Sequence, residues 1–157
     1  MIIKSSDEIN SVLKTYFFIE KKISWFKNIK ILEVGSGKTG EGLLGLADRY
    51  NGKIQCFGVD DVVPENSNRI SLFRQNPDSI PFADNYFEIV YSCNYLFYFE
   101  DEKMLGILKE VLRVLKSNGY FVFNDYRRNN EKYEEMISRT GIRAKITDGS
   151  PKLIIKY

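Results

Sequence analysis

The sequence predicts an α/β protein, a three-layer αβα sandwich on a Rossmann-like, mostly parallel sheet of seven strands with an antiparallel C-terminal hairpin. Three observations support this prediction. Short apolar runs alternate with helix-length segments along the chain. A glycine cluster, Gly35, Gly37 and Gly40, follows the first apolar run. Two strand-like runs at the end of the chain are separated only by the turn Asp148-Gly-Ser-Pro151. Right-handed crossovers then place helices on both faces of the sheet.

The individual elements follow from hydrophobic spacing. Strands are predicted over residues 30–34, 53–59, 70–74, 87–92, 120–124, 142–147 and 152–157. Helices are predicted over residues 39–50, 101–116 and 131–140, and Asn118-Gly119 is expected to end the second of these. The polar connection 61–69 is too short for a standard crossover helix.

The chain of 157 residues is most simply a single domain, residues 1–157. Residues 1–28 are expected to form an N-terminal helical segment that packs over the cofactor site, because apolar residues recur at three- and four-residue spacings. We interpret Tyr16 and Phe17 as core residues, with a role in covering a ligand as the alternative. No signal-peptide pattern and no apolar run of about 20 residues occurs, which favours a cytoplasmic protein without a membrane partner.

Composition excludes several kinds of chemistry. The sequence has no histidine, which removes the commonest general base and the commonest metal ligand, so no metal site is expected. Its two cysteines, Cys56 and Cys93, lie in apolar runs and are interpreted as buried hydrophobes without a disulfide. A net charge of +2 lacks the strongly basic signature of a nucleic-acid binder.

The glycine cluster has three possible ligands. Gly37-Lys38-Thr39 imitates the end of a P-loop, but Leu32 stands where that motif needs a glycine. The spacing also matches a dinucleotide fingerprint, with Asp60 as the ribose ligand. Glu33 argues against a pyrophosphate at that turn and instead suits a ligand with a cationic amino-acid end, such as S-adenosylmethionine.

Four stretches in the same order resemble the class I S-adenosylmethionine-dependent methyltransferases, of the small type known as methyltransferase type 11. They are Ile31-Leu-Glu-Val-Gly-Ser-Gly37, Phe57-Gly-Val-Asp60, residues 76–90 and residues 108–122. The resemblance implies the cofactor S-adenosyl-L-methionine and a cofactor site made of Glu33, Gly35, Ser36, Gly37, Asp60, Asp61, Asn76, Pro77, Ser92 and Cys93. The glycine loop is one residue longer than the family pattern, at Lys38-Thr39, and Asn76 replaces the family's acid.

The methyl acceptor is not identified by the sequence, and it can be a small molecule or a macromolecule. Aromatic residues 95 and 97–99 are expected at the rim of the site, and the segment Arg127-Arg128 with Lys132 reads either as a solvated loop or as a guide for an anionic acceptor. No catalytic residue is assigned. The candidates for a general base are Asp84, Tyr98, Glu100, Asp101, Asp125 and Tyr126. The alternative function is an inactive methyltransferase-fold module that acts as a partner subunit in a homo- or hetero-oligomer.

Overall fold

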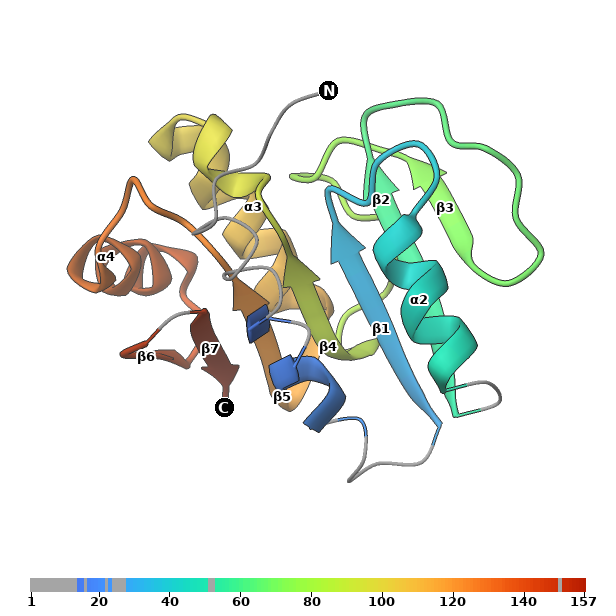
Figure 1. Ribbon diagram of the computed structural model, residues 1–157. Coiled ribbons are helices and arrows are strands. Elements are labelled where there is room, and N and C mark those ends of the chain that lie inside the picture. The colour runs from blue at the N-terminus through green and yellow to red at the C-terminus, as the bar shows by residue number, and fades with distance from the viewer. Residues whose placement is uncertain (1–13, 16, 22, 24–27, 51–52, 150) are drawn as a thin grey trace.

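A computed structural model of the protein describes residues 14–15, 17–21, 23, 28–50, 53–149 and 151–157 (Figure 1). Its centre is one seven-stranded sheet with the strand order β3-β2-β1-β4-β5-β7-β6. The strands are β1 (Ile29–Val34), β2 (Ile54–Asp60), β3 (Ser71–Arg74), β4 (Phe87–Ser92), β5 (Leu115–Phe123), β6 (Ala144–Thr147) and β7 (Lys152–Lys156). The first five are parallel, and β7 is antiparallel to both β5 and β6. The predicted architecture is therefore confirmed.

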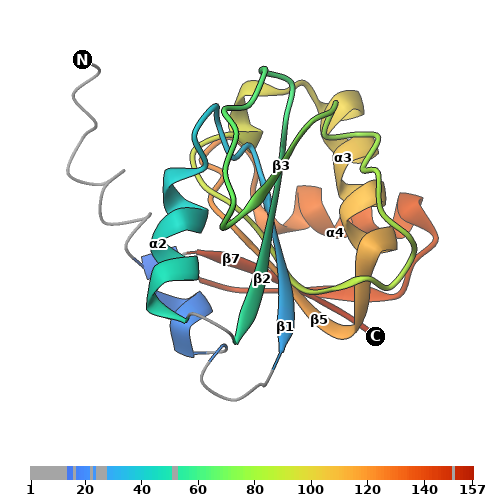
Figure 2. The ribbon, with the colours of Figure 1, turned by 90° about the vertical axis from the view of Figure 1, so that its right-hand side faces the viewer.

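Helices cover both faces of this sheet (Figure 2). They are α2 (Glu41–Arg49), α3 (Asp101–Val114) and α4 (Asn130–Thr140), together with a short 3₁₀ turn, η1 (Leu96–Tyr98). In Figure 2, α2 and the helical residues near the N-terminus lie on one side of the sheet, and α3 and α4 lie on the other. The apolar stripe of α3 is fully buried on its side, as its three- and four-residue spacing predicts. No helix among the described residues is long and apolar enough to span a membrane.

The described part of the N-terminal segment packs on the α2 side. Ile19 and Ile23 are buried in one cluster with Leu43 of α2 and Ile31 of β1. Phe17, which we expected in the core, is 71% exposed, so that prediction is wrong. It lies on the outward side of the turn whose inward residues are these isoleucines. Tyr16 and residues 1–13 lie outside the described part, and the predicted cover over the cofactor site stays a prediction.

The junction between α3 and β5 differs from the prediction. The helix ends at Val114 and the strand begins at Leu115, whereas we expected Asn118-Gly119 to end the helix. Leu115 is buried and pairs with Phe87, so the strand begins five residues before its predicted start at Tyr120. Asn118 adopts a left-handed conformation with φ of 62°, and the pairing of β4 with β5 shifts register between Phe87 and Ile89. The Asn-Gly pair therefore bends the strand rather than capping the helix.

Arg113 fastens the loop before β4 to α3. Its guanidinium donates to Glu110 at 2.8 and 2.9 Å and to Asp84 at 2.8 Å. The same group donates to the carbonyls of Ile80 and Phe82 at 2.9 and 2.8 Å. Such a forked array needs the planar guanidinium, because an ammonium cannot present five donors.

Replacing Arg113 with alanine should therefore destabilise the fold by about 2–4 kcal/mol, since two partly buried carbonyls and two carboxylates lose their donor. Urea unfolding followed by circular dichroism measures the loss. The matched control is Arg139→Ala: among the described residues its guanidinium bonds only the exposed Glu102, at 3.1 Å, so the substitution should cost no more than about 0.5 kcal/mol. Equal effects of the two variants would contradict the role assigned to Arg113.

Candidate functional site

The candidate site lies at the carboxyl ends of β1, β2 and β4, where the chain leaves each strand. The glycine turn after β1 is held against β2 because Gly35 donates its amide to the Val59 carbonyl at 2.9 Å. Gly35, Gly37 and Gly40 have φ values of 84°, 69° and 62°, which side chains rarely tolerate. These three left-handed positions accommodate the longer loop before α2 begins. The loop is also tied to the connection 61–69, where Glu65 donates its amide to the Lys38 carbonyl at 2.8 Å.

Asp60 ends β2 and closes this turn. Its carboxylate accepts the amide of Gly37 at 2.8 Å and the amide of Val62 at 3.3 Å. Burial, and to a smaller extent the neighbouring Asp61, raises the pKa of Asp60 above its ordinary value, although both amides oppose the shift. A carboxylate has about four lone-pair positions, so Asp60 retains capacity for a further hydrogen-bond donor.

Glu33 is buried beside the turn. Its carboxyl group accepts the Tyr91 hydroxyl at 3.1 Å, across the register that pairs Glu33 with Tyr91 in neighbouring strands. The pKa of Glu33 is raised from 4.5 to about 8: burial is the main cause, the hydroxyl of Tyr91 opposes the shift, and the charge of Asp60 adds to it. Tyr91 was not among the predicted site residues. Aligning the ends of the first and fourth predicted strands would have placed it opposite Glu33.

Ser92 and Ser36, which are predicted to contact the cofactor, make side-chain contacts within the protein, and a neighbouring backbone hydrogen bond positions Asn76. Ser92 donates its hydroxyl to the Val34 carbonyl at 2.7 Å and so joins β4 to β1. Ser36 is directed at β2, since a methyl group added at Gly58 would lie 2.5 Å from its hydroxyl oxygen. Asn76 is exposed and follows Gln75, whose amide donates to the Asp60 carbonyl at 2.7 Å. This bond places the segment of Asn76 and Pro77 next to the end of β2.

The remaining predicted residues occupy the edges of the site. Asp61 is exposed directly after β2, and Cys93 is half-buried directly after β4. Cys56 lies deeper, and burial raises the pKa of its thiol to about 12, so it is the inert hydrophobe that we predicted. Both cysteines are free thiols.

Tyr95 lies over the glycine turn. A methyl group added at Gly35 would lie 2.3–2.7 Å from carbons of the Tyr95 ring, so the ring is in direct contact with the glycine. Burial, with a smaller contribution from the charges of Asp60 and Asp61, raises the pKa of Tyr95 well above its usual range. The sequence placed Tyr95 at the aromatic rim, and the structure places it inside, against the predicted cofactor contacts.

The basic residues after β5 form ion pairs and hydrogen bonds with neighbouring segments. Arg128 is buried and bonds Asp125 at 2.9 Å and Asp101 at 2.8 Å. Arg127 donates to the Phe97 and Phe99 carbonyls at 3.0 and 3.3 Å and lies 3.6 Å from Glu100. Lys132 pairs with Asp101 at 3.4 Å. For Arg128 the interpretation as a solvated loop residue is wrong, because Asp125 draws it into the protein.

The same contacts reduce the number of candidates for a general base. Asp125 is buried and accepts the Tyr133 hydroxyl and the Arg127 amide in addition to Arg128, so it is held within the protein. Asp101 bonds Arg128 and Lys132, and the bond to Arg128 is the main reason that its pKa is lowered. Asp84 bonds Arg113 and precedes β4, at the opposite end of the sheet. Of the candidates, Glu100, Tyr98 and Tyr126 remain exposed near the site.

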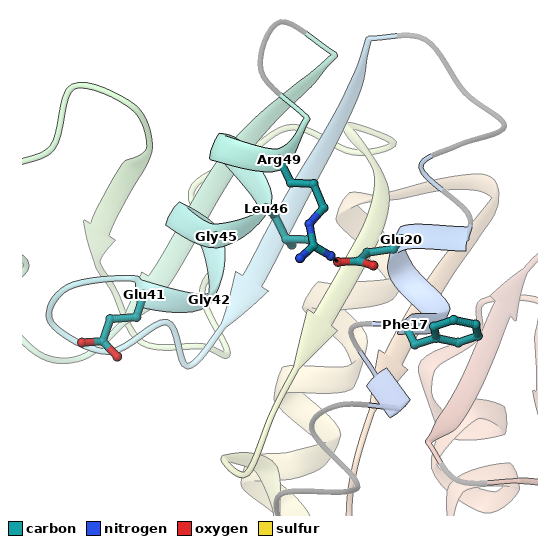
Figure 3. A pocket seen from close by; sticks show the side chains of 7 residues that line it. All are labelled: Phe17, Glu20, Glu41, Gly42, Gly45, Leu46 and Arg49. Atoms are coloured by element: carbon teal, nitrogen blue, oxygen red, sulfur yellow. Dashed lines mark hydrogen bonds and ion pairs between the residues drawn. The ribbon is translucent and has the colours of Figure 1, made fainter.

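A groove elsewhere on the surface is distinct from this site. It has a volume of about 670 Å³ and is lined by Phe17, Glu20, Glu41, Gly42, Gly45, Leu46 and Arg49. Figure 3 shows Arg49 of α2 reaching toward Glu20 across it, and these two side chains form an ion pair. The groove lies between α2 and the helical residues near the N-terminus (Figure 3), and none of the residues that line it is a predicted cofactor residue.

The fold and the site define the class of protein. A sheet with this strand order, a glycine turn after β1 and a partly buried acid at the end of β2 is the arrangement of Rossmann-like proteins that bind nucleotides or nucleosides.

The family follows from comparison with known proteins. The family model described as "Methyltransferase domain" matches residues 32–123. The chain therefore belongs to this family, and it is a class I S-adenosylmethionine-dependent methyltransferase by fold and sequence pattern. A search of curated protein sequences found no match.

Solved structures share the fold at low sequence identity. One is a putative S-adenosyl-L-methionine-dependent methyltransferase from Methanococcus maripaludis, with 18% identity, 99% of this chain and 96% of that chain covered, and a TM-score of 0.64. Another is a Burkholderia thailandensis 1,6-didemethyltoxoflavin-N1-methyltransferase with bound S-adenosylhomocysteine, with 12% identity, 92% and 76% coverage and a TM-score of 0.66. A third is a putative methyltransferase in complex with the Trm112 methyltransferase activator of Haloferax volcanii, with 18% identity, 92% and 75% coverage and a TM-score of 0.63.

The raised pKa of Glu33 makes stability depend on pH. Below pH 4.5 the carboxyl group is protonated in both states and carries no penalty. As the pH rises from 4.5 to about 8, the unfolded chain releases a proton that the folded chain keeps, so stability falls. The side chain of Glu33→Gln does not titrate, so this loss of stability is absent from the variant. At pH 8 the variant should therefore be more stable than the natural chain by on the order of a few kcal/mol. Urea unfolding of both chains at pH 5 and pH 8 measures the difference, and a constant difference would contradict the buried, protonated Glu33.

Proposed function

We propose that the protein binds S-adenosyl-L-methionine at the carboxyl ends of β1, β2 and β4 and transfers its methyl group to an acceptor. The observation that supports this most directly is a pair of acids, Glu33 and Asp60, that lie at one edge of the sheet with raised pKa values. Two such groups favour a ligand that brings positive charge and oppose a pyrophosphate. The cofactor has an ammonium at one end and ribose hydroxyls toward the other.

The residues fit this cofactor in their chemistry. In the proposal, the glycine turn admits the methionine part, Glu33 faces the ammonium, and Asp60 accepts the ribose hydroxyls. Asp61, Asn76 and Pro77 border the adenine, and Ser92 and Cys93 lie near the reactive end. The amide of Gly37 already orients the Asp60 carboxylate, so the acid is held in place before a ligand arrives.

When bound, the cofactor supplies an electrophilic methyl group and a neutral leaving group. The chain's own part is to hold the acceptor in line and to exclude water, which can account for much of the rate of such a reaction. Phe97 and Tyr126, with ring centroids 5.8 Å apart, and the exposed Tyr98 offer a surface for a planar or apolar acceptor. We assign no general base, because an acceptor that loses no proton needs none.

A partner-subunit role is the alternative. The Haloferax volcanii structure is a complex between a methyltransferase activator and a putative methyltransferase, and an association of that kind is compatible with the open rim of this chain. The specific observation in its favour is the Tyr95 ring over Gly35, because the ring lies where a cofactor would pack.

Substitution of Asp60 by alanine tests the proposal. The natural chain should bind S-adenosylhomocysteine in isothermal titration calorimetry, and Asp60→Ala should weaken binding by at least about tenfold because a charge-assisted acceptor is lost. Glu65→Ala is the matched control, since Glu65 is an exposed acid paired with Lys38 at 3.2 Å on the same edge of the protein. No heat at about 1 mM S-adenosylhomocysteine, or equal losses in both variants, would contradict the proposed function. Binding of NAD in its place would support a dinucleotide site.

The number of protons released when the ligand binds tests the role of Glu33 separately. Because its pKa is about 8, Glu33 is mainly protonated at pH 7 in the free protein. The ammonium of a bound cofactor favours the carboxylate, so binding should release a proton, up to one for each ligand. Calorimetry at pH 7 in phosphate and in Tris measures the release, because the two buffers differ in ionisation enthalpy. The release should vanish in Glu33→Gln, and its persistence there would assign the proton to another group.

A further inference from the structure

The Tyr95 ring occupies part of the proposed cofactor site. It lies so close to Gly35 that one added methyl group would overlap it. The ring is half-buried and meets Phe99 edge to face, with centroids 5.0 Å apart. A glycine in a left-handed turn permits close approach of a ligand to the backbone, and here an aromatic side chain of the same protein makes that approach.

An amide pair holds the segment that carries Tyr95. Asn94 donates its backbone amide to the side-chain oxygen of Asn124 at 2.7 Å, which fixes the orientation of the Asn124 amide. The Asn124 nitrogen must then face the Asn94 side-chain oxygen, and it donates to it. Asn94 is therefore clamped to the end of β5, directly beside Tyr95.

This clamped arrangement carries two costs. Asn94 adopts a left-handed conformation, with φ of 51°. Its side-chain nitrogen is buried and has no hydrogen-bond partner within the part of the chain that the structure describes. The orientation of Asn124 prevents relief by turning the Asn94 amide over, because two nitrogens would then face each other. A buried donor without a partner lowers the stability of this arrangement relative to one that satisfies it.

We propose that Tyr95 is a gate on the cofactor site, closed in this structure, and that cofactor binding requires the ring to leave Gly35. The inference rests on the proposed function, since the ligand it admits is the one proposed above. The ring and the methionine part of the cofactor need the same face of the glycine turn, so they exclude each other. The Asn94–Asn124 pair stabilises the closed state. The left-handed backbone of Asn94 and its side-chain nitrogen, unpartnered among the described residues, limit that stability, so the gate can open.

A gate lowers apparent affinity in a defined way. If the open state makes up about 1–10% of the free protein, the apparent dissociation constant exceeds the intrinsic one by about tenfold to a hundredfold. Removing the ring should recover this factor. Tyr95→Ala should therefore bind S-adenosylhomocysteine about ten to a hundred times more tightly than the natural chain, as measured by isothermal titration calorimetry.

Two control variants isolate the ring at Gly35. Tyr95→Phe keeps the ring without the hydroxyl and should bind within about twofold of the natural chain. Tyr157→Ala removes a tyrosine that is 57% exposed and follows β7, away from the site, and it should also leave cofactor affinity within about twofold. Unchanged or weaker binding by folded Tyr95→Ala would overturn the gate.

A second variant serves if Tyr95→Ala does not fold. Asn124→Ala keeps the ring and removes the acceptor of the Asn94 amide, so it destabilises the closed state and should tighten binding by at least about threefold. Unchanged or weaker binding by this variant would overturn the gate. The two proposals fail differently. Binding by the natural chain that depends on Asp60, without tightening in either variant, removes only the gate. No binding by any folded variant at about 1 mM removes the proposed function and the gate with it.

Discussion

The hydrogen bond between the Gly37 amide and the Asp60 carboxylate is the contact on which the site depends. It joins the loop after β1 to the tip of β2, and the bond from Gly35 to Val59 reinforces it two residues earlier. Because strands β1 and β2 are neighbours in register from Ile29 to Val34, their tips arrive together. The turn between β1 and α2 can then be irregular without losing its place. The turn that carries Lys38-Thr39 passes through three left-handed glycines, while both strand ends stay fixed.

The fold could be predicted almost completely from the sequence, because its strands are short apolar runs with clear boundaries. The bounds of β4, Phe87–Ser92, agree with the prediction at both ends. The predicted junction between α3 and β5 was wrong because it relied on a local signal, Asn118-Gly119. The burial of Leu115, which determines where the strand begins, is visible only once the sheet is assembled. The prediction that Phe17 lies in the core was wrong for a similar reason, since helical spacing does not say which of two adjacent faces meets the core.

The site was harder to predict than the fold, because its side chains interact across strands. Glu33 and Asp60 stand at strand tips in the sequence, but the influence of Asp60 on the pKa of Glu33 depends on the register of β1 and β2. Tyr95 was assigned to the rim from its place in an aromatic run. The left-handed Asn94 and its clamp to Asn124 bring Tyr95 against Gly35, and neither is visible in residue order. Arg128 was misread because one of its partners, Asp101, lies at the start of α3, far from Arg128 and Asp125 in the sequence.

The two acids Glu33 and Asp60 and the ring of Tyr95 lie at the same site, so charge and packing there must be considered together. Burial raises the pKa of both Glu33 and Asp60. The ring of Tyr95 adds no charge there, because its own pKa is raised by burial and by Asp60 and Asp61. A neutral aromatic ring is therefore a compatible cover for acids that lack a cation. In the proposed exchange, a ligand that displaces the ring must offset the loss of its contacts with Gly35 and Phe99. A cationic ligand can do so by letting Glu33 ionise against it, at a site where low solvent exposure strengthens that attraction. The selectivity for a positively charged ligand would then come from the acids, and the threshold for its binding from the ring.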